Sequence, residues 1–183
     1  MAKTAQHPVL VIMGVSGSGK STVAGLLASR LGWDFAEGDD LHPEANVAKM
    51  HAGQPLTDAD RQPWLESIAG WIRQHRDAGL PGVVTCSALK KRYRDVLRGD
   101  GVVFVFLDGS RDRISDRLAA RLGHFMPASL LASQFEALEA PTADENSITL
   151  SASSAPADEA QEIIDRLVLH AVRAREALDT DRP

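Results

Sequence analysis

Continuous apolar runs alternate along this chain with segments in which apolar residues recur every three or four positions. The runs at residues 9–13 and 102–107 are typical of buried parallel strands. Shorter apolar runs at residues 35–37, 82–86 and 148–150 predict three further strands. The pattern therefore predicts five strands separated by helices.

Helical periodicity fills the intervals between these runs, and residues that favour helix ends mark several boundaries. Gly32 is suited to end the first helix, and Thr57 and Ser129 are suited to cap later ones. Asp108, at the end of the fourth strand, is also expected to cap a helix. Helices are predicted over residues 20–31, 42–52, 57–78, 90–98, 111–121, 129–139 and 158–178. This alternation predicts an α/β fold, a five-stranded parallel sheet flanked by helices on both faces.

Residues 14–21, Gly-Val-Ser-Gly-Ser-Gly-Lys-Ser, fit the phosphate-binding P-loop pattern G-x-x-x-x-G-K-[ST] between a predicted strand and a predicted helix. Glycines let consecutive backbone N–H groups wrap a polyphosphate, and the start of the helix adds partial positive charge. Lys20 is expected to reach the β- and γ-phosphates, and the Ser21 hydroxyl to ligate Mg²⁺. The expected ATP-binding residues are Gly14, Val15, Ser16, Gly17, Ser18, Gly19, Lys20, Ser21 and Thr22.

Composition narrows the class of protein further. The chain has 183 residues with 44% hydrophobic content, which suits one compact domain spanning residues 1–183. A net charge of −5 argues against a nucleic-acid partner. The single cysteine, Cys86, fits a reducing, cytoplasmic environment, and no apolar run reaches the length of a membrane span. No signal peptide is expected at the amino-terminal end.

The P-loop alone does not distinguish kinases, ATPases and GTPases. A GTPase needs a guanine-reading N-K-x-D segment, whereas Asn46 and Asn146 are followed by Val47 and Ser147. A large mechanochemical ATPase needs a longer chain. The sequence therefore favours a small phosphotransferase, which needs an acceptor pocket and a carboxylate near the acceptor hydroxyl.

Asp39 is the expected carboxylate, because it follows the second predicted strand at the edge of the sheet where ligands bind in open α/β folds. It could orient and deprotonate a hydroxyl, or hold Mg²⁺ through water. The alternative is that residues 37–42 form a solvated or capping acidic loop.

Two arginines point to a lid. Arg117 and Arg121 stand four residues apart, so they project from one helical face before the Gly- and Pro-bounded break at residues 123–127. We expect a lid at about residues 121–130 that closes over ATP, with both arginines neutralising charge on the transferring phosphate. The alternative is an ordinary solvated basic face.

Several longer segments resemble gluconokinases. These are Gly-Asp-Asp-Leu-His-Pro at 38–43 with Asn46, Lys49 and Met50, the segment 53–65 that contains Asp-Arg-Gln-Pro-Trp-Leu, the segment 86–95 that begins Cys-Ser-Ala-Leu-Lys-Lys, and residues 117–125 and 134–141. The resemblance spans about residues 9–168. It implies a fold of the nucleoside-monophosphate-kinase type with a lid, and a homodimer. It also implies ATP- and Mg²⁺-dependent phosphorylation of D-gluconate at its 6-hydroxyl, a step of gluconate metabolism that feeds the pentose phosphate and Entner–Doudoroff routes.

A sugar acid needs a cation for its carboxylate and polar partners for its hydroxyls. Arg61, Lys90 and Arg94 are candidates for the carboxylate, and His42 and His124 for the hydroxyls. Each has a structural alternative; for Arg61 it is an ion pair within its own helix.

The sequence also departs from the family pattern in two places. Leu122 stands where relatives often carry a basic residue, and the Ser-rich segment 148–154 has no aspartate after the last strand. Two alternative functions remain open at this stage, a kinase for a related sugar acid and a non-catalytic ATP-binding regulator.

Overall fold

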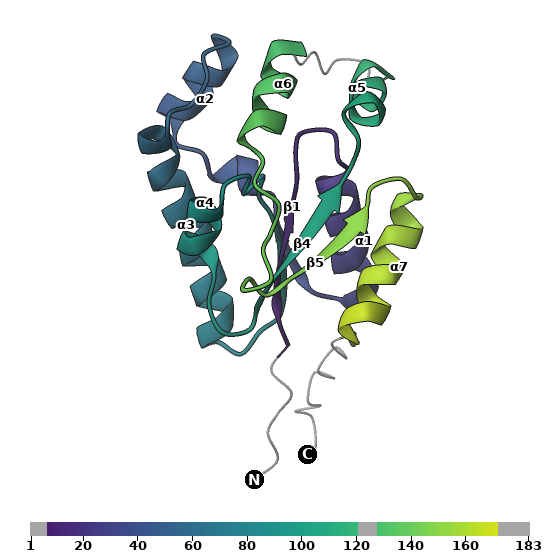
Figure 1. Ribbon diagram of the computed structural model, residues 1–183. Coiled ribbons are helices and arrows are strands. Elements are labelled where there is room, and N and C mark those ends of the chain that lie inside the picture. Colours follow the sequence, from purple (N-terminus) through teal and green to yellow (C-terminus); the bar gives the residue numbers. More distant parts are fainter. Residues whose placement is uncertain (1–6, 121–127, 172–183) are drawn as a thin grey trace, which may run out of the picture.

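The structure, a computed structural model, describes residues 7–120 and 128–171, and within them the predicted five strands form one parallel sheet (Figure 1). The strand order is β2-β3-β1-β4-β5, and every neighbouring pair is parallel. The strands are β1 (Val9–Met13), β2 (Asp34–Ala36), β3 (Gly82–Thr85), β4 (Val102–Asp108) and β5 (Ser147–Ser151). The predicted α/β fold class is confirmed.

Helices connect the strands, as predicted, with one addition. The addition is a short 3-10 helix, η1 (Gly38–Leu41), which carries the acidic residues after β2. The helices are α1 (Lys20–Leu31), α2 (Glu44–His51), α3 (Asp58–Asp77), α4 (Lys91–Leu97), α5 (Arg111–Ala120), α6 (Ala128–Ala137) and α7 (Pro156–Leu167).

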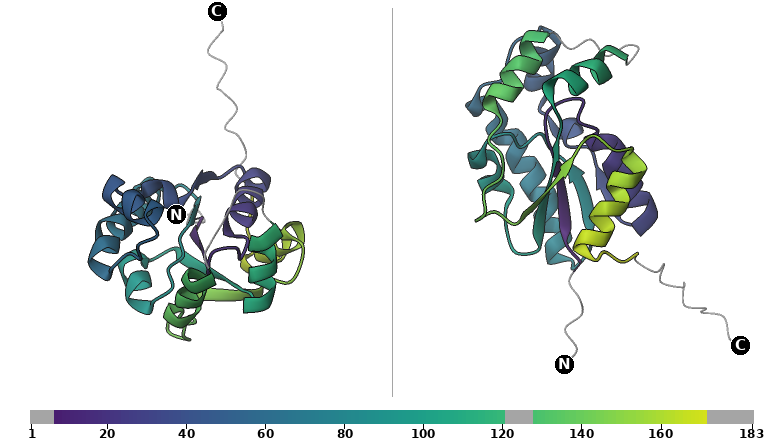
Figure 2. Two further views of the ribbon diagram at one scale, coloured as in Figure 1. Left: turned by 90° about the horizontal axis from the view of Figure 1, so that it is seen from above. Right: turned by 45° about the vertical axis from the view of Figure 1, so that its right-hand side comes forward.

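The sheet is covered on both faces because successive side chains of a strand point to opposite sides. Val9, Val11 and Met13 of β1 pack into a core with α3 and α4, whereas Leu10 and Ile12 pack into a second core with α1 and α7. Seen from above in Figure 2, α3 and α4 lie on one side of the sheet, and α1 and α7 lie on the other. All five of these side chains are fully buried, so β1 is the centre of the fold.

The carboxyl ends of the strands share one edge of the sheet, where α5 and α6 lie above it in Figure 1. A third, smaller core joins this edge: Val15 and Leu89, which follow β1 and β3, pack with Ile114 of α5 and Leu131 of α6. The P-loop and the loop after β3 are therefore fixed by apolar contacts to the helices that flank the expected lid.

Two predicted capping residues and one predicted helix end are wrong. The helix after β4 is capped by Ser110, whose Oγ accepts a 3.4 Å hydrogen bond from the Arg113 backbone, and not by Asp108. Ser129 lies inside α6 because that helix already includes Ala128. The final helix ends at Leu167, where Val168 adopts a left-handed φ of 53°, and not at residue 178.

Candidate active site

The P-loop connects β1 to α1 and has the backbone of an anion cradle. Gly14, Gly17 and Gly19 have φ values of 147°, 80° and 98°, a region that other residues rarely adopt. A Cβ atom at Gly17 would also lie 2.8 Å from the side chain of Leu118. The loop therefore requires glycine both for its backbone conformation and for its contact with α5.

Lys20 lies at the first position of α1 with its ammonium group folded back over the loop. Its Nζ donates to the backbone oxygens of Gly14 and Val15 at 3.0 Å each, which places the positive charge at the mouth of the cradle. Ser21 and Thr22 follow in the first turn and are exposed. The chain thus places a cation, a helix N-terminus and an exposed serine next to the glycine-rich loop, a combination that suits an anion.

Gln134 of α6 binds the P-loop directly, although the sequence analysis assigned no role to this residue. Its Oε1 accepts a 2.8 Å hydrogen bond from the Ser16 backbone, and its Nε2 donates to the Ser16 hydroxyl at 3.1 Å. Residue 134 stands within the last of the segments that resemble gluconokinases, which was the only available signal. The helix that follows the expected lid is therefore connected to the phosphate cradle.

Arg117 of α5 lies beside the same loop. One guanidinium nitrogen donates to the Ser18 oxygen at 3.4 Å, and the other donates to the Ala152 oxygen at 2.8 Å in the segment after β5. Beneath it, burial raises the pKa of the Glu159 carboxyl, while the positive charge of Arg117 lowers it. Arg117 thus connects the cradle to the carboxyl end of β5.

Asp39 stands on a bend whose shape depends on Gly38. The Gly38 N–H donates to the Thr85 hydroxyl at 3.0 Å, and its oxygen accepts a 2.7 Å hydrogen bond from the Trp64 ring. A Cβ atom at Gly38 would lie 1.9 Å from the Thr85 backbone oxygen. This close contact between β3 and η1 turns Asp39 outward, and its side chain is 80% exposed.

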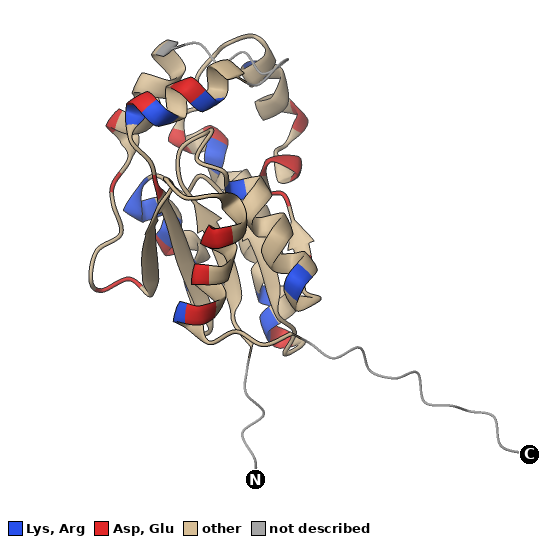
Figure 3. Ribbon diagram, turned by 90° about the vertical axis from the view of Figure 1, so that its right-hand side faces the viewer, with Lys and Arg blue, Asp and Glu red and all other residues tan. Residues whose placement is uncertain are grey.

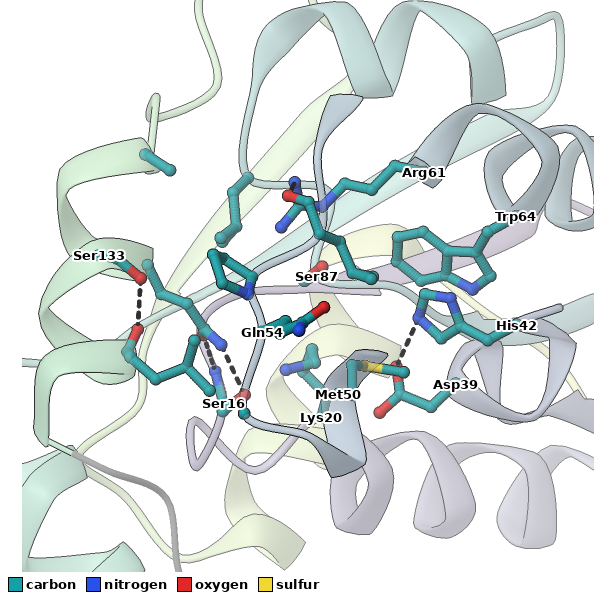
Figure 4. A pocket seen from close by; sticks show the side chains of 17 residues that line it. Ser16, Lys20, Asp39, His42, Met50, Gln54, Arg61, Trp64, Ser87 and Ser133 are labelled. Carbon is teal, nitrogen blue, oxygen red and sulfur yellow. Dashed lines mark hydrogen bonds and ion pairs between the residues drawn. The ribbon is translucent and has the colours of Figure 1, made fainter. Parts of the chain in front are cut away.

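His42 lies next to Asp39 on the same wall. Its ring stacks on Trp64 with centroids 4.1 Å apart, its side chain is only 4% exposed, and its Nε2 lies 4.0 Å from Asp39 Oδ1 (Figure 4). Burial lowers the pKa of His42 below its ordinary value; Asp39 opposes that shift and Arg61 adds to it. His42 is therefore favoured in its neutral form.

One cavity of about 340 Å³ brings the two halves of the candidate site together. Lys20 of the cradle and Asp39 of the bend both line it, and Figure 4 shows their side chains pointing into the same space. Its lining consists of Ser16, Lys20, Asp39, His42, Met50, Gly53, Gln54, Pro55, Leu56, Arg61, Trp64, Ser87, Leu89, Leu130, Ser133, Gln134 and Ala137.

Arg61 and Lys90, both predicted to bind a carboxylate, flank the ring of Tyr93 at 5.7 Å each. Arg61 lines the cavity and donates to the Leu56 oxygen at 2.6 Å, so it does not form the intrahelical ion pair considered as its alternative. Lys90 Nζ instead lies 3.6 Å from Asp58, outside the cavity lining. Of these two cations, only Arg61 faces the candidate site.

Arg94, the third predicted carboxylate ligand, lies in the protein interior and not in the cavity. Its side chain is 1% exposed and pairs with Glu145, whose side chain is 2% exposed, at 2.6 Å. Its Nη1 donates to the backbone oxygens of Ala88 and Leu89 at 2.8 and 3.3 Å. The structure therefore corrects the prediction: Arg94 supports the loop after β3 and has no direct access to a bound substrate.

Other expectations concern residues outside the described parts of the chain. Arg121 and His124, and most of the predicted lid at 121–130, fall in the range 121–127, which the structure does not describe.

Within residues 7–120 and 128–171, no cluster of three or more His, Cys, Asp or Glu side chains could hold a metal ion. The described helices include none that is long and apolar enough to cross a membrane. In the view of Figure 3, positive and negative residues are interspersed along the ribbon.

Comparison with known proteins identifies the relatives of this chain. A model of the shikimate kinase family matches residues 16–170. The gluconokinase of Gluconobacter oxydans (strain 621H) is 56% identical over 163 residues, which cover 88% of this chain and 89% of that protein.

Two solved structures are similar as well. A sugar kinase from Janibacter sp. HTCC2649, in unliganded form, superposes with a TM-score of 0.85 at 45% identity, covering 91% of this chain and 99% of the other. A gluconokinase from Sinorhizobium meliloti 1021 superposes with a TM-score of 0.80 at 43% identity, covering 88% and 94% of the two chains.

Proposed function

The chain belongs to the gluconokinase family, within the wider group of P-loop kinases that the shikimate kinase model also matches, and on that premise we propose a specific reaction. The enzyme transfers the γ-phosphoryl group of ATP to the 6-hydroxyl of D-gluconate, giving 6-phospho-D-gluconate and ADP. The observation that carries this proposal is the shared cavity, in which Lys20 and Asp39 face the same space.

The phosphate side of the reaction belongs to the cradle. Backbone N–H groups of residues 14–19 and the N-terminus of α1 bind the polyphosphate, and Lys20 exchanges its two backbone oxygens for β- and γ-phosphate oxygens. Arg117, whose guanidinium lies beside the Ser18 oxygen, neutralises charge that develops on the transferring group. Arg121 has the same proposed role.

A magnesium ion fits the start of α1. The Ser21 hydroxyl is exposed there beside the glycine-lined hollow, and an alcohol oxygen together with phosphate oxygens is a ligand set that Mg²⁺ accepts. When bound, the ion supplies charge neutralisation between the β- and γ-phosphates. No protein carboxylate is needed as a direct ligand in this arrangement.

The acceptor side of the reaction belongs to Asp39, His42 and Arg61. Asp39 accepts the hydrogen bond of the 6-hydroxyl and holds its oxygen in line with the γ-phosphorus. Its main contribution is position, because phosphoryl transfer is largely dissociative and needs little early proton removal. Arg61, which lines the same cavity, binds the substrate carboxylate, and His42 and His124 bind hydroxyls.

A homodimer and a place in gluconate metabolism ahead of the pentose phosphate pathway are expected from the family. A cytoplasmic location is expected from the single cysteine, Cys86. The single kinase domain over residues 1–183, with its lid near residues 121–130, also remains a prediction.

The experiment that tests the reaction is an acceptor panel. ADP release should require both gluconate and Mg²⁺ and should fail with shikimate or AMP, because a pocket that hydrogen-bonds hydroxyls discriminates steeply between acceptors. Phosphorus NMR of the product should show one phosphate ester at the C6 position. Equal turnover with shikimate would refute the proposed substrate, and faster turnover with another aldonic acid would reassign it.

A further inference from the structure

Asn46 is a buried amide that no step of the proposed reaction uses. It lies in α2 with only 4% of its surface exposed, between the start of α3 and the ring of His42. Its Nδ2 is 2.8 Å from the Asp60 backbone oxygen and 3.2 Å from His42 Nδ1. A buried side-chain amide with two well-defined partners constrains both of them.

The contact with Asp60 fixes which way the amide faces. A backbone oxygen only accepts hydrogen bonds, so the Asn46 atom that faces it must be the NH₂ group. The second N–H of the same group then points at His42 Nδ1. A nitrogen that faces an N–H must offer a lone pair, so Nδ1 of His42 is unprotonated and the ring proton lies on Nε2.

This arrangement sets the hydrogen-bond polarity of the substrate wall. His42 Nε2 lies 4.0 Å from Asp39 Oδ1, too far for a direct hydrogen bond but close enough for both groups to contact one oxygen atom. With the proton on Nε2, His42 donates and Asp39 accepts. A hydroxyl group is the partner that satisfies both, because its oxygen accepts from His42 while its hydrogen points to Asp39.

The opposite tautomer would remove this complementarity. With the proton on Nδ1, His42 Nε2 and Asp39 would both be acceptors, and one hydroxyl hydrogen could serve only one of them. We propose that Asn46 is a positioning residue that holds His42 in the Nε2–H tautomer, so that His42 and Asp39 together recognise a single hydroxyl of the sugar acid. This role of Asn46 adds to the proposed function, and the assignment of the hydroxyl to gluconate rests on that function.

The charged groups around His42 are compatible with this neutral donor. The charge of Asp39 raises the pKa of His42, and the charge of Arg61 on α3 lowers it. Lys20 shares the cavity, while Glu44 and His51 line a shallow groove on the outer face of α2 next to His42. Burial against Trp64 disfavours the imidazolium, which would also bring an N–H on Nδ1 against the amide of Asn46.

The tautomer can be read directly on the unmodified protein. Nitrogen NMR of the His42 ring at neutral pH should show Nδ1 as an unprotonated nitrogen and Nε2 as a protonated one. Reversed signals, or two protonated nitrogens, would overturn the proposal. Because this measurement needs no substrate, it separates the tautomer from the choice of gluconate as acceptor.

Two matched substitutions test the consequence for the substrate. In His42→Gln the amide nitrogen can replace Nε2 as donor, whereas in His42→Asn it can replace only Nδ1. Both variants should melt similarly, but the KM for gluconate should rise about tenfold more in His42→Asn, the value of one hydrogen bond. Equal KM values for gluconate in the two variants would contradict the donor role of Nε2.

Asn46→Ala completes the test, with Gln62→Ala on the exposed face of α3 as its control. In the parent enzyme Asn46→Ala should raise the KM for gluconate about tenfold with little change in the KM for ATP. In the His42→Gln background it should change the KM for gluconate little, since an amide has no tautomer to hold. The same loss in both backgrounds would mean that Asn46 acts only through general stability.

A panel of monodeoxy-gluconates identifies the recognised group. One analogue should lose affinity with the parent enzyme and lose much less with Asn46→Ala and His42→Asn, because the variants no longer read the missing hydroxyl. If the variants penalise every analogue as the parent does, the His42–Asp39 pair does not read a hydroxyl.

Discussion

The two walls of the cavity are built in different ways. The phosphate wall is made of backbone from consecutive residues 14–19, shaped by glycines with positive φ values and completed by Lys20. The acceptor wall is made of side chains from η1, α2 and α3, held by hydrogen bonds between Gly38, Asn46 and Trp64 and their neighbours. Backbone N–H groups do not distinguish one polyphosphate from another, so the proposed specificity for the acceptor depends on the second wall.

This difference predicts which substitutions affect nucleotide, which affect acceptor, and which affect only folding. Arg94 lies behind the acceptor wall and not in it, so its substitution should affect stability and not substrate binding. We expect this to be the largest effect of the series. Arg94→Met should destabilise the protein by about 3–5 kcal/mol in urea unfolding, because it leaves the Glu145 carboxylate buried without its partner.

The control for this prediction is the double variant Arg94→Met with Glu145→Leu, which removes both charges and should recover much of the lost stability. At temperatures where it is folded, its KM for gluconate should be close to that of the parent. A large rise in that KM without loss of stability would return Arg94 to the substrate site.

Lys20→Ala tests the phosphate wall. Loss of the ammonium group should lower kcat by about 10²–10³-fold, which is the usual cost of removing one group that stabilises charge in a transition state. ADP release at saturating gluconate measures this. A turnover number equal to that of the parent would overturn the assignment of the cradle.

Asp39→Asn should act on the acceptor wall alone. The amide keeps the size of the side chain, but only one of its two terminal atoms can accept a hydrogen bond from the hydroxyl, and it cannot take up the proton. The kcat should therefore fall about 10²-fold. ATP affinity, measured by calorimetry, should change little because the cradle is untouched. An equal loss of ATP affinity would show that the two walls are not separable.

Arg61→Met should have a smaller, binding-specific effect. The KM for gluconate should rise about tenfold with a smaller change in kcat, because a carboxylate contact formed equally in ground and transition states affects binding. Removing the carboxylate from the substrate, by using the sugar alcohol as acceptor, should make parent and variant alike. If the difference between them persists, Arg61 does not bind the carboxylate.

The smallest effect concerns pH and the start of α3. Hydrogen bonds from Lys49 and from Thr57 hold the pKa of Asp60 at about 2, below its ordinary value of 3.8. Since the folded pKa is the lower one, this stabilisation is present above pH 4 and is lost as the pH falls toward 2. Melting curves of the parent and of Asp60→Asn should therefore converge between about pH 4 and pH 2. Parallel curves would remove Asp60 from the acid response.

The difference between the two walls also explains which parts of the structure could be predicted from the sequence. The bounds of β1 and α1 were predicted to the residue because the signals for them are local, and the loop between them has the positive φ values expected at Gly14, Gly17 and Gly19. The cap of α3 at Thr57 was equally local, and the structure confirms it as a capping box with Asp60. Of the proposed acceptor residues, Asp39 was suggested by its place after β2, whereas His42 and Arg61 were suggested only after the resemblance to gluconokinases was found.

At Arg94 and Gln134 the sequence misled because each residue's partner is far away in the chain, whereas the error at the end of α7 was local. Arg94 looked like a ligand because its partner, Glu145, is 51 residues away and no local pattern connects them. Gln134 was given no role, since its contact with Ser16 joins positions 118 residues apart. The exposed Val168 ends α7 by its backbone conformation although its sequence continues the apolar spacing.

We propose that the cradle and Asp39 serve one reaction from two walls of the same cavity. A crystal structure with gluconate and a non-hydrolysable ATP analogue would show whether they do. We expect the 6-hydroxyl within hydrogen-bond distance of the Asp39 carboxylate, facing the γ-phosphorus beside Lys20. A gluconate bound with that hydroxyl directed away from both groups would contradict it.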